Sequence, residues 1–230
     1  MKLNGIILTG VTLMALTPAH SALTLPNYIS DNMIVQQNCT FTFKGHSTPG
    51  SKVSIRTGWE SKCHDTKADA NGSFSITLPT PPAGGPYSIT ISDGKESKTF
   101  ENVLSGEVWI CSGQSNMEFP VQGWTTVMDY DREVATAHHP DIRLLQVKKT
   151  TAFRPQDDIT VNGGGWQICS SASMADFSAI AYFYARELSQ QLHVPVGVID
   201  ATWGGTPAEA WTSAEALQSV PGFEHELADM

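Results

Sequence analysis

The stretch SGEVWICSGQSNMEFP, residues 105–120, decides how the second half of the chain is built. Its apolar run EVWIC (107–111) predicts a buried strand, because short continuous apolar runs are typical of strands covered on both faces. Gly113 allows a sharp turn off that strand, and the residues from 116 onward can begin a short helix. Ser115 therefore follows the strand end, where it is either a nucleophile or part of an ordinary Ser/Asn turn.

Further apolar runs alternate with helical patterns after this stretch. IRLLQV (142–147) and VPVGVID (194–200) predict two more buried strands. Between the first and second strands, TTVMDYDREVATAHH (125–139) predicts a helix, and we interpret His138-His139-Pro140 as a helix end or a loop rather than a pair of metal ligands. The alternation predicts an α/β domain with a parallel sheet and helices on both of its faces.

A second helix is predicted by DFSAIAYFYARELSQQL (176–192). Either Asp176 or Ser178 can cap its N-terminus. Apolar side chains recur at helical spacing of three and four along it, at Ile180, Phe183, Tyr184, Leu188 and Leu192. We expect these five side chains to form the buried face of the helix.

Two strand ends carry the candidate chemistry, CSGQSNM (111–117) and ATWGGTP (201–207). The carboxyl ends of parallel strands lie at one edge of the sheet, where ligands bind. Free N–H groups at a helix start, together with a side-chain-free backbone at Gly204-Gly205, could surround the Ser115 oxygen and stabilise an oxyanion. The pattern is not the G-x-S-x-G nucleophile elbow, because Met117 replaces its second glycine.

The first half of the chain reads as strands throughout, from residue 24 to about 103. Apolar and polar residues alternate in four runs, as is typical of a sheet with one solvent-exposed face: CTFTFKG (39–45), KVSIRT (52–57), SFSITLP (73–79) and YSITIS (87–92). Turn-forming residues separate the runs, and Asp93-Gly94 predicts a hairpin. Short strands at this spacing predict an immunoglobulin-like β-sandwich.

Composition narrows the partners and the compartment. The net charge of −9 argues against binding to nucleic acid or to anionic membranes. Residues 1–22 combine Lys2, an apolar run too short to span a bilayer, and small residues at a cleavage site, which predicts a signal peptide and export rather than a buried first element. The four cysteines are scattered, disulfides stay possible after export, and no spacing suggests a metal site.

Three blocks together resemble the sialate O-acetylesterase family, a branch of the SGNH-type hydrolases. They are GEVWICSGQSNMEFPV, FSAIAYFYARELSQQLHVPVGVID and WGGTPAEAW, in the family's order and at similar separations. The likeness covers about residues 24 to 215. It implies a signal peptide at 1–22, a β-sandwich at 23–103 and an SGNH-type three-layer α/β domain from 104 to 230.

The resemblance also implies the chemistry. Ser115 would be the nucleophile of the G-Q-S-N-M block and would donate its N–H to the oxyanion, and Gly204 or Gly205 would complete the oxyanion hole. The same blocks would place Gln114, Asn116, Trp203 and Thr206 against the substrate. The implied reaction is hydrolysis of acetyl esters on sialic acids or related sugars, without a cofactor or a metal.

One part of the family pattern is missing. The family has a later Q-G-E-S/A-N block and a D-x-x-H block that supplies the catalytic acid and histidine, and neither occurs here. None of the seven histidines (20, 46, 64, 138, 139, 193 and 225) follows an acid by three residues, and we interpret His225 as a surface residue. We therefore expect an N-terminal portion of an esterase that lacks its general base and has an unpaired sheet edge.

Two alternatives stay open. A non-catalytic carbohydrate-binding protein would use the sandwich and the aromatic faces of Trp124, Trp203 and Trp211. An acetylxylan-type esterase would share the serine chemistry and differ in its substrate.

Overall fold

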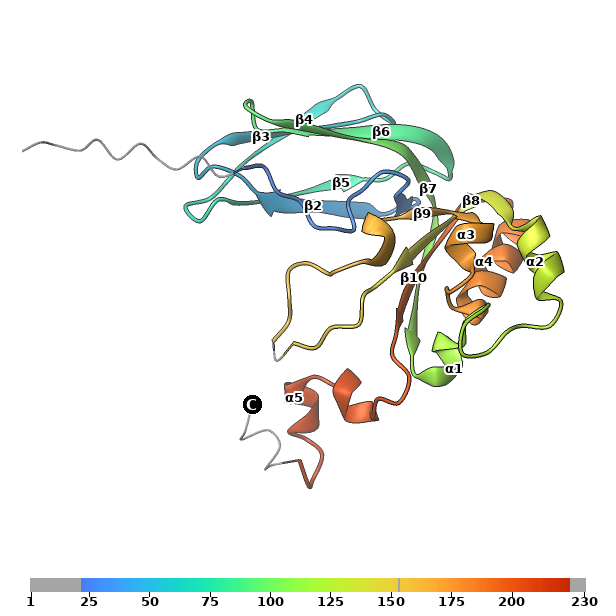
Figure 1. The fold of residues 1–230 in the computed structure, drawn as a ribbon. Coiled ribbons are helices and arrows are strands. Elements are labelled where there is room, and N and C mark those ends of the chain that lie inside the picture. The colour runs from blue at the N-terminus through green and yellow to red at the C-terminus, as the bar shows by residue number, and fades with distance from the viewer. Residues whose placement is uncertain (1–21, 153, 224–230) are drawn as a thin grey trace, which may run out of the picture.

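The computed structural model describes residues 22–152 and 154–223 (Figure 1). Residues 1–21 of the expected signal peptide, and His225, lie outside the described residues, so those two expectations stay predictions. None of the helices in the described ranges is both long and apolar enough to cross a membrane.

Two β-layers form the first half of the chain (Figure 1). The strands are β1 (Ile34–Gln36), β2 (Thr40–His46), β3 (Lys52–Thr57), β4 (Cys63–Lys67), β5 (Ser73–Pro79), β6 (Gly84–Ser92) and β7 (Ser97–Gly113). One layer is the antiparallel pair β2-β5, and the other runs β4-β3-β6-β7. A hairpin at Asp93-Gly94 joins β6 to β7, as expected. The immunoglobulin-like topology stays a prediction.

The core between these layers follows the period-2 pattern. Val53, Ile55, Ile89 and Ile91 are fully buried, and Phe43 lies opposite them, also fully buried. Burial of such side chains stabilises the folded state by about 1.5–3 kcal/mol each relative to leaving them exposed. The alternation in the sequence therefore identified most of this core correctly.

The second half contains a mixed sheet in the order β7-β10-β8-β9. Its further elements are α1 (Ser115–Glu118), α2 (Tyr130–Thr136), β8 (His138–Gln146), η1 (Asn162–Gly164), β9 (Gln167–Ser170), α3 (Ser171–Met174), α4 (Ala179–Leu192), β10 (Val196–Thr202), η2 (Ala208–Trp211) and α5 (Ala214–Leu217). β10 pairs in parallel with both β7 and β8, which confirms the expected parallel sheet. β9 adds an antiparallel edge that the sequence did not predict.

The interpretation of His138-His139-Pro140 as a helix end or a loop is wrong. α2 ends at Thr136, and His138 already begins β8, where His138 and His139 pair with Ser170 and Cys169 of β9. The pairing with β9 could not be read locally, because its partner residues lie about thirty positions further along the chain.

β7 joins the two halves in one strand of 17 residues. Its first part pairs with β6, and from Glu107 to Gly113 it pairs with β10 (Figure 1). The expected domain boundary between residues 103 and 104 falls inside this strand, and the division into 23–103 and 104–230 stays a prediction.

The expectation of helices on both faces of the sheet differs from the structure. Among the described residues, α1 to α4 pack together on one face, around Leu144, Val196 and Val198. Side chains of the opposite face, such as Leu145, instead join the core of the first half. The second helical layer of the expected three-layer domain is therefore not found in the described part of the chain.

The expected burial of the run EVWIC is also only partly correct. Cys111 is buried, but Trp109 is 42% exposed and Ile110 is 71% exposed. Trp109 stacks edge-to-face on Tyr184 of α4, with 5.3 Å between ring centroids. In the described residues this part of β7 pairs with β10 alone, which leaves its other edge open, as the expected unpaired edge requires.

α4 is capped by Ser178, whose hydroxyl accepts the N–H of Ala181, as one of the two expected caps. The prediction of which side chains of this helix are buried is wrong, however. Ala179, Ala181, Tyr182 and Ala185 are the buried residues, whereas Ile180, Tyr184 and Leu192 are exposed and Phe183 and Leu188 are half-buried. Small alanines allow the helix axis to approach the sheet closely, so packing distance rather than side-chain hydrophobicity selected this face.

A buried arginine ties the halves together next to β7. Arg143 of β8 is 2% exposed, and its guanidinium donates to the backbone oxygens of Asn32 (3.0 Å), Asn102 (3.2 Å) and Pro140 (3.2 Å). Burial lowers the pKa of Arg143 to about 10, so the group stays charged at neutral pH. The charged guanidinium thus offsets the burial of these three carbonyl oxygens.

We predict that Arg143→Met lowers the free energy of unfolding by about 3 kcal/mol, because it removes the charged donor of three hydrogen bonds to backbone carbonyls. Urea unfolding followed by tryptophan fluorescence measures the change. Arg132→Met on the exposed side of α2 is the matched control and should have almost no effect. Equal stability of the two variants would contradict the proposed role of Arg143.

Candidate active site

The two strand ends predicted to carry the chemistry meet at one edge of the sheet. Gly113 at the end of β7 pairs with Thr202 at the end of β10. Immediately beyond this pair, the N–H of Trp203 donates to the carbonyl of Gly113 over 2.9 Å. Both loops that follow therefore start from the same point, at the carboxyl edge where parallel sheets bind ligands.

Ser115 is the first residue of α1 and is exposed. Gly113 has a φ of +146°, a backbone conformation that favours glycine, and the chain turns there into the helix. The carbonyl of Gln114 accepts the N–H groups of Met117 and Glu118, so those of Ser115 and Asn116 are the unused donors of the helix start. Among the described residues, the Ser115 hydroxyl makes no hydrogen bond.

Gly204 lies against Ser115. A Cβ atom at position 204 would stand 3.3 Å from the Cα of Ser115 and 3.4 Å from its Cβ. Contacts this close explain why the chain has no side chain at this point. Gly205 follows with a φ of +79° and open space on its outer side. The structure thus brings together Ser115 and the predicted glycine pair.

Three of the four predicted substrate-binding residues, Gln114, Trp203 and Thr206, hold the two loops together. The Gln114 side chain donates to the carbonyl of Thr206 over 2.6 Å, and the Thr206 hydroxyl donates to the carbonyl of Trp203 over 2.7 Å. The indole N–H of Trp211 donates to the Thr206 hydroxyl over 2.7 Å. Asn116 is exposed beside Ser115, and the assignment of these residues to substrate binding stays a prediction.

Glu118 is a candidate site residue that the sequence patterns did not indicate. Its carboxylate accepts the N–H of Gly204 and forms an ion pair with Lys149, which follows β8. Glu118 stands three positions after Ser115 on the same short helix, and residues three apart on a helix share one face. That spacing was the available signal, whereas the partner Lys149 could not be inferred from local sequence.

The charge of Glu118 is stabilised by these contacts. Burial by itself raises the pKa of Glu118, but the hydrogen bonds from Lys149 and from the Gly204 N–H outweigh it and hold the pKa below its ordinary value. The N–H of Gly204 is therefore bound to a carboxylate in this structure. Gly205 and Ser115 keep their N–H groups available.

A cavity of about 400 Å³ opens beside this edge, lined by Glu118, Trp124, Lys149, Asp200 and Thr202 among others. Asp200 is 2% exposed, and its carboxylate accepts the Thr202 hydroxyl (2.6 Å) and the Gln146 amide (3.4 Å). Burial raises the pKa of Asp200, and the charge of Glu118 adds to that effect. Ser115 is not part of this lining, and Glu118 connects the cavity to it.

The described residues hold no group of three or more His, Cys, Asp or Glu side chains that could bind a metal ion. Their four cysteines are unpaired, with Cys39 and Cys63 exposed and Cys111 and Cys169 buried. Burial of Cys111 agrees with the buried strand predicted for the run EVWIC.

We predict that Glu118→Ala raises the hydrogen-exchange rate of the Gly204 amide about tenfold, because it removes one charge-assisted acceptor. Glu118→Gln should have a smaller effect, since its side-chain oxygen can still accept. Exchange measured by NMR at the Gly204 amide tests both variants. Unchanged exchange in Glu118→Ala would contradict the contact.

The same contact predicts a pH dependence. Because the folded-state pKa of Glu118 is lowered, protection of the Gly204 amide is complete above the ordinary glutamate pKa and is lost as pH falls through the lowered value. Loss of protection already at or above the ordinary value would show that Lys149 does not stabilise the carboxylate.

Comparison with known proteins gives a consistent result. The sequence model of a family described as "Carbohydrate esterase, sialic acid-specific acetylesterase" matches residues 105–221. The chain is 31% identical to the sialate O-acetylesterase of Homo sapiens over 209 residues, which are 84% of this chain and 39% of that protein. It is 28% identical to the sialate O-acetylesterase of Mus musculus over 218 residues, covering 87% of this chain and 40% of that protein.

The fold is similar to that of a carbohydrate acetylesterase from Xanthomonas citri, with a TM-score of 0.79 and 33% sequence identity. The match covers 86% of this chain and 44% of that one. The chain spans about 40% of the length of the curated relatives it matches. With a family match over half of its residues and a mixed α/β fold like that of a known acetylesterase, the chain belongs to the sialic acid-specific acetylesterase family of carbohydrate esterases.

Proposed function

We propose that this protein hydrolyses O-acetyl esters of sialic acids, with Ser115 as the nucleophile. The observation that carries the proposal is the position of Ser115, exposed at the start of α1 and in contact with Gly204 from the neighbouring strand end. A serine with preorganised N–H donors around it suits acyl transfer. Membership of the esterase family supports the acetylated sugar as substrate.

In this mechanism the Ser115 hydroxyl attacks the acetyl carbonyl carbon and transfers its proton to a base. Negative charge develops on the carbonyl oxygen, where the N–H of Ser115 and that of Gly205 would stabilise it. The tetrahedral intermediate then expels the sugar oxygen, which takes the proton from the base to become a hydroxyl, and leaves an acetyl ester on Ser115. Water hydrolyses that ester and releases acetate.

The Gly204 N–H has a different role in this proposal. It is already bound to the Glu118 carboxylate, whose negative charge would oppose an oxyanion competing for the same donor. We therefore assign Gly205 rather than Gly204 to the oxyanion. Glu118 and Lys149 act as positioning residues that hold the glycine turn against α1.

We place the general base outside these 230 residues. No histidine among the described residues makes a hydrogen bond to Ser115, and the matched relatives extend well beyond the segment they share with this chain. The family's D-x-x-H block would supply the missing acid and histidine. Such a continuation would also add to the SGNH-type domain at the β7 edge, which is open from Glu107 to Gly113 among the described residues.

We also propose that the protein acts outside the cytoplasm, on the basis of the leader pattern at residues 1–22.

A second candidate function is sugar binding without catalysis, which the exposure of Trp124 (65%) and Trp211 (46%) favours. Hydrolysis of acetylated xylan would use the same serine on another sugar.

We predict that the 230-residue chain releases acetate from 9-O-acetylated sialic acid more slowly than the human relative by on the order of 10⁴-fold or more, because loss of a triad member costs at least about that factor in rate. Acetate release followed by a coupled assay measures the rate. A rate close to that of the human enzyme would show that a base lies within this chain.

We further predict that free imidazole restores part of the activity and that Ser115→Ala abolishes this restored part. Imidazole can accept the proton that the missing histidine would take. The Ser115→Ala variant measured with the same imidazole concentration corrects for hydrolysis in solution. Equal rates for the two proteins would remove Ser115 as the nucleophile and favour the binding function.

A further inference from the structure

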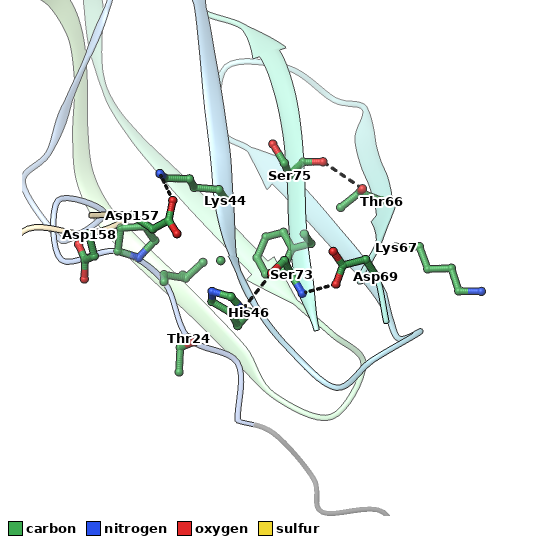
Figure 2. A pocket seen from close by; sticks show the side chains of 14 residues that line it. Thr24, Lys44, His46, Thr66, Lys67, Asp69, Ser73, Ser75, Asp157 and Asp158 are labelled. Atoms are coloured by element: carbon green, nitrogen blue, oxygen red, sulfur yellow. Dashed lines mark hydrogen bonds and ion pairs between the residues drawn. The ribbon is translucent and has the colours of Figure 1, made fainter. Parts of the chain in front are cut away.

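A second cavity, of about 510 Å³, lies on the outer face of the β2-β5 layer, and Ser115 is not part of its lining (Figure 2 shows the lining residues). Its volume is within the range of pockets that hold small organic ligands. Residues from five parts of the chain line it: the segment that precedes β1, strand β2, the end of β4 with the turn after it, strand β5 and the loop at 157–158. No step of the proposed esterase reaction uses this cavity.

Hydrogen bonds fix the walls of the cavity. Thr24 and His46 exchange two backbone hydrogen bonds of 2.9 Å each, which hold the N-terminal segment along β2. The Asp158 carboxylate accepts the backbone N–H (2.8 Å) and the side-chain amide (2.7 Å) of Asn27, which holds the loop against that segment. At the other end, Asp69 accepts the N–H of Ser73 over 2.9 Å. The shape of the cavity is therefore set before any ligand enters.

Polar side chains of β2 and β5 line the cavity in alternating positions along each strand (Figure 2). Lys44 and His46 alternate along β2, so both stand on its outer face, and Ser75 and Ser73 lie opposite them on β5. The Ser73 hydroxyl and His46 Nδ1 lie 3.2 Å apart, and His46 Nε2 makes no hydrogen bond within the described residues. Leu25, Pro26 and Phe74 supply an apolar side.

Lys44 and Asp157 form an open donor-acceptor pair. The Lys44 ammonium and an Asp157 carboxylate oxygen are 3.7 Å apart, which is longer than a good hydrogen bond. The Asp157 side chain is 99% exposed, so the pair is weakly held and both groups keep hydrogen-bonding capacity. A group that both donates and accepts can bind the two at once.

We propose that this cavity binds a neutral sugar ring through two neighbouring hydroxyl groups. Each hydroxyl of a vicinal diol can donate to Asp157 or accept from Lys44, and a third hydroxyl can reach His46 Nε2. The apolar side would face the C–H groups of the ring. An acidic sugar suits the cavity less well, because Asp69, Asp157 and Asp158 outnumber Lys44 and Lys67 in its lining.

The site would give this esterase a second contact with its glycan, independent of hydrolysis. The test is an NMR titration of the Ser115→Ala chain with methyl β-galactopyranoside at concentrations up to about 50 mM. We expect saturable shifts of the backbone amides of Lys44, His46 and Ser75. Tetrahydropyran-2-methanol, which keeps the ring and lacks the vicinal diol, should cause no such shifts.

Two variants test the donor-acceptor pair. Lys44→Met keeps the aliphatic stem and removes the donor, and Asp157→Ala removes the acceptor at a fully exposed position; each should weaken binding about tenfold. Lys62→Met, in the exposed turn before β4, is the matched control and should bind like the parent.

Three results would overturn the proposal. The first is an absence of shifts with the galactoside, and the second is equal binding of the diol-free ring. The third is binding of free N-acetylneuraminic acid that becomes tighter in Asp157→Ala, which would identify a site for an anion. Because the titration uses Ser115→Ala, its outcome does not depend on whether the proposed esterase reaction occurs.

Discussion

The backbone pairing of β7 is the constraint on which the rest of the structure depends. One strand carries the hairpin to β6 at its start, the parallel pairing with β10 at its end, and Ser115 two residues beyond. Side chains alternate between the faces of a strand, so a slip of one residue would move Cys111 out of the helical core and displace Gly113 from Thr202. Packing in the first half therefore fixes the position of the serine in the second.

The charged contacts of the site follow from this register. Because the ends of β7 and β10 are level, Gly204 reaches α1 and its N–H meets the Glu118 carboxylate. Lys149 lies close by since β8 pairs with β10 on the other side. The segments that follow β7, β10 and β8 thus contribute Glu118, Gly204 and Lys149 to one network. Removing the charge at Glu118 would remove the link between Gly204 and Lys149.

Local patterns were sufficient where the physical cause was local. Alternation along single strands identified Val53, Ile55, Ile89 and Ile91, since each strand has one face on the core. The strand ends before Gly113 and Gly204-Gly205 were expected at one edge of the sheet, and the pairing of Gly113 with Thr202 confirms this. Local patterns were not sufficient where burial or contacts depend on residues far away in the sequence. The exposed Ile180 and Ile110 depend on how closely a helix packs and on which strand lies alongside, and the Glu118–Lys149 pair joins segments 31 residues apart.

The open edge of β7 has a geometric consequence for the proposed reaction. From Glu107 to Gly113 this strand pairs with β10 alone in the described residues, so its other edge is free to accept a partner. A strand added there in parallel would end at the same edge of the sheet as β7, and the loop after it would pass beside Ser115. The serine, the glycine turn and Glu118 already occupy the β10 side. The β7 side is therefore the direction from which an acid and a histidine can approach the Ser115 hydroxyl without displacing the existing network.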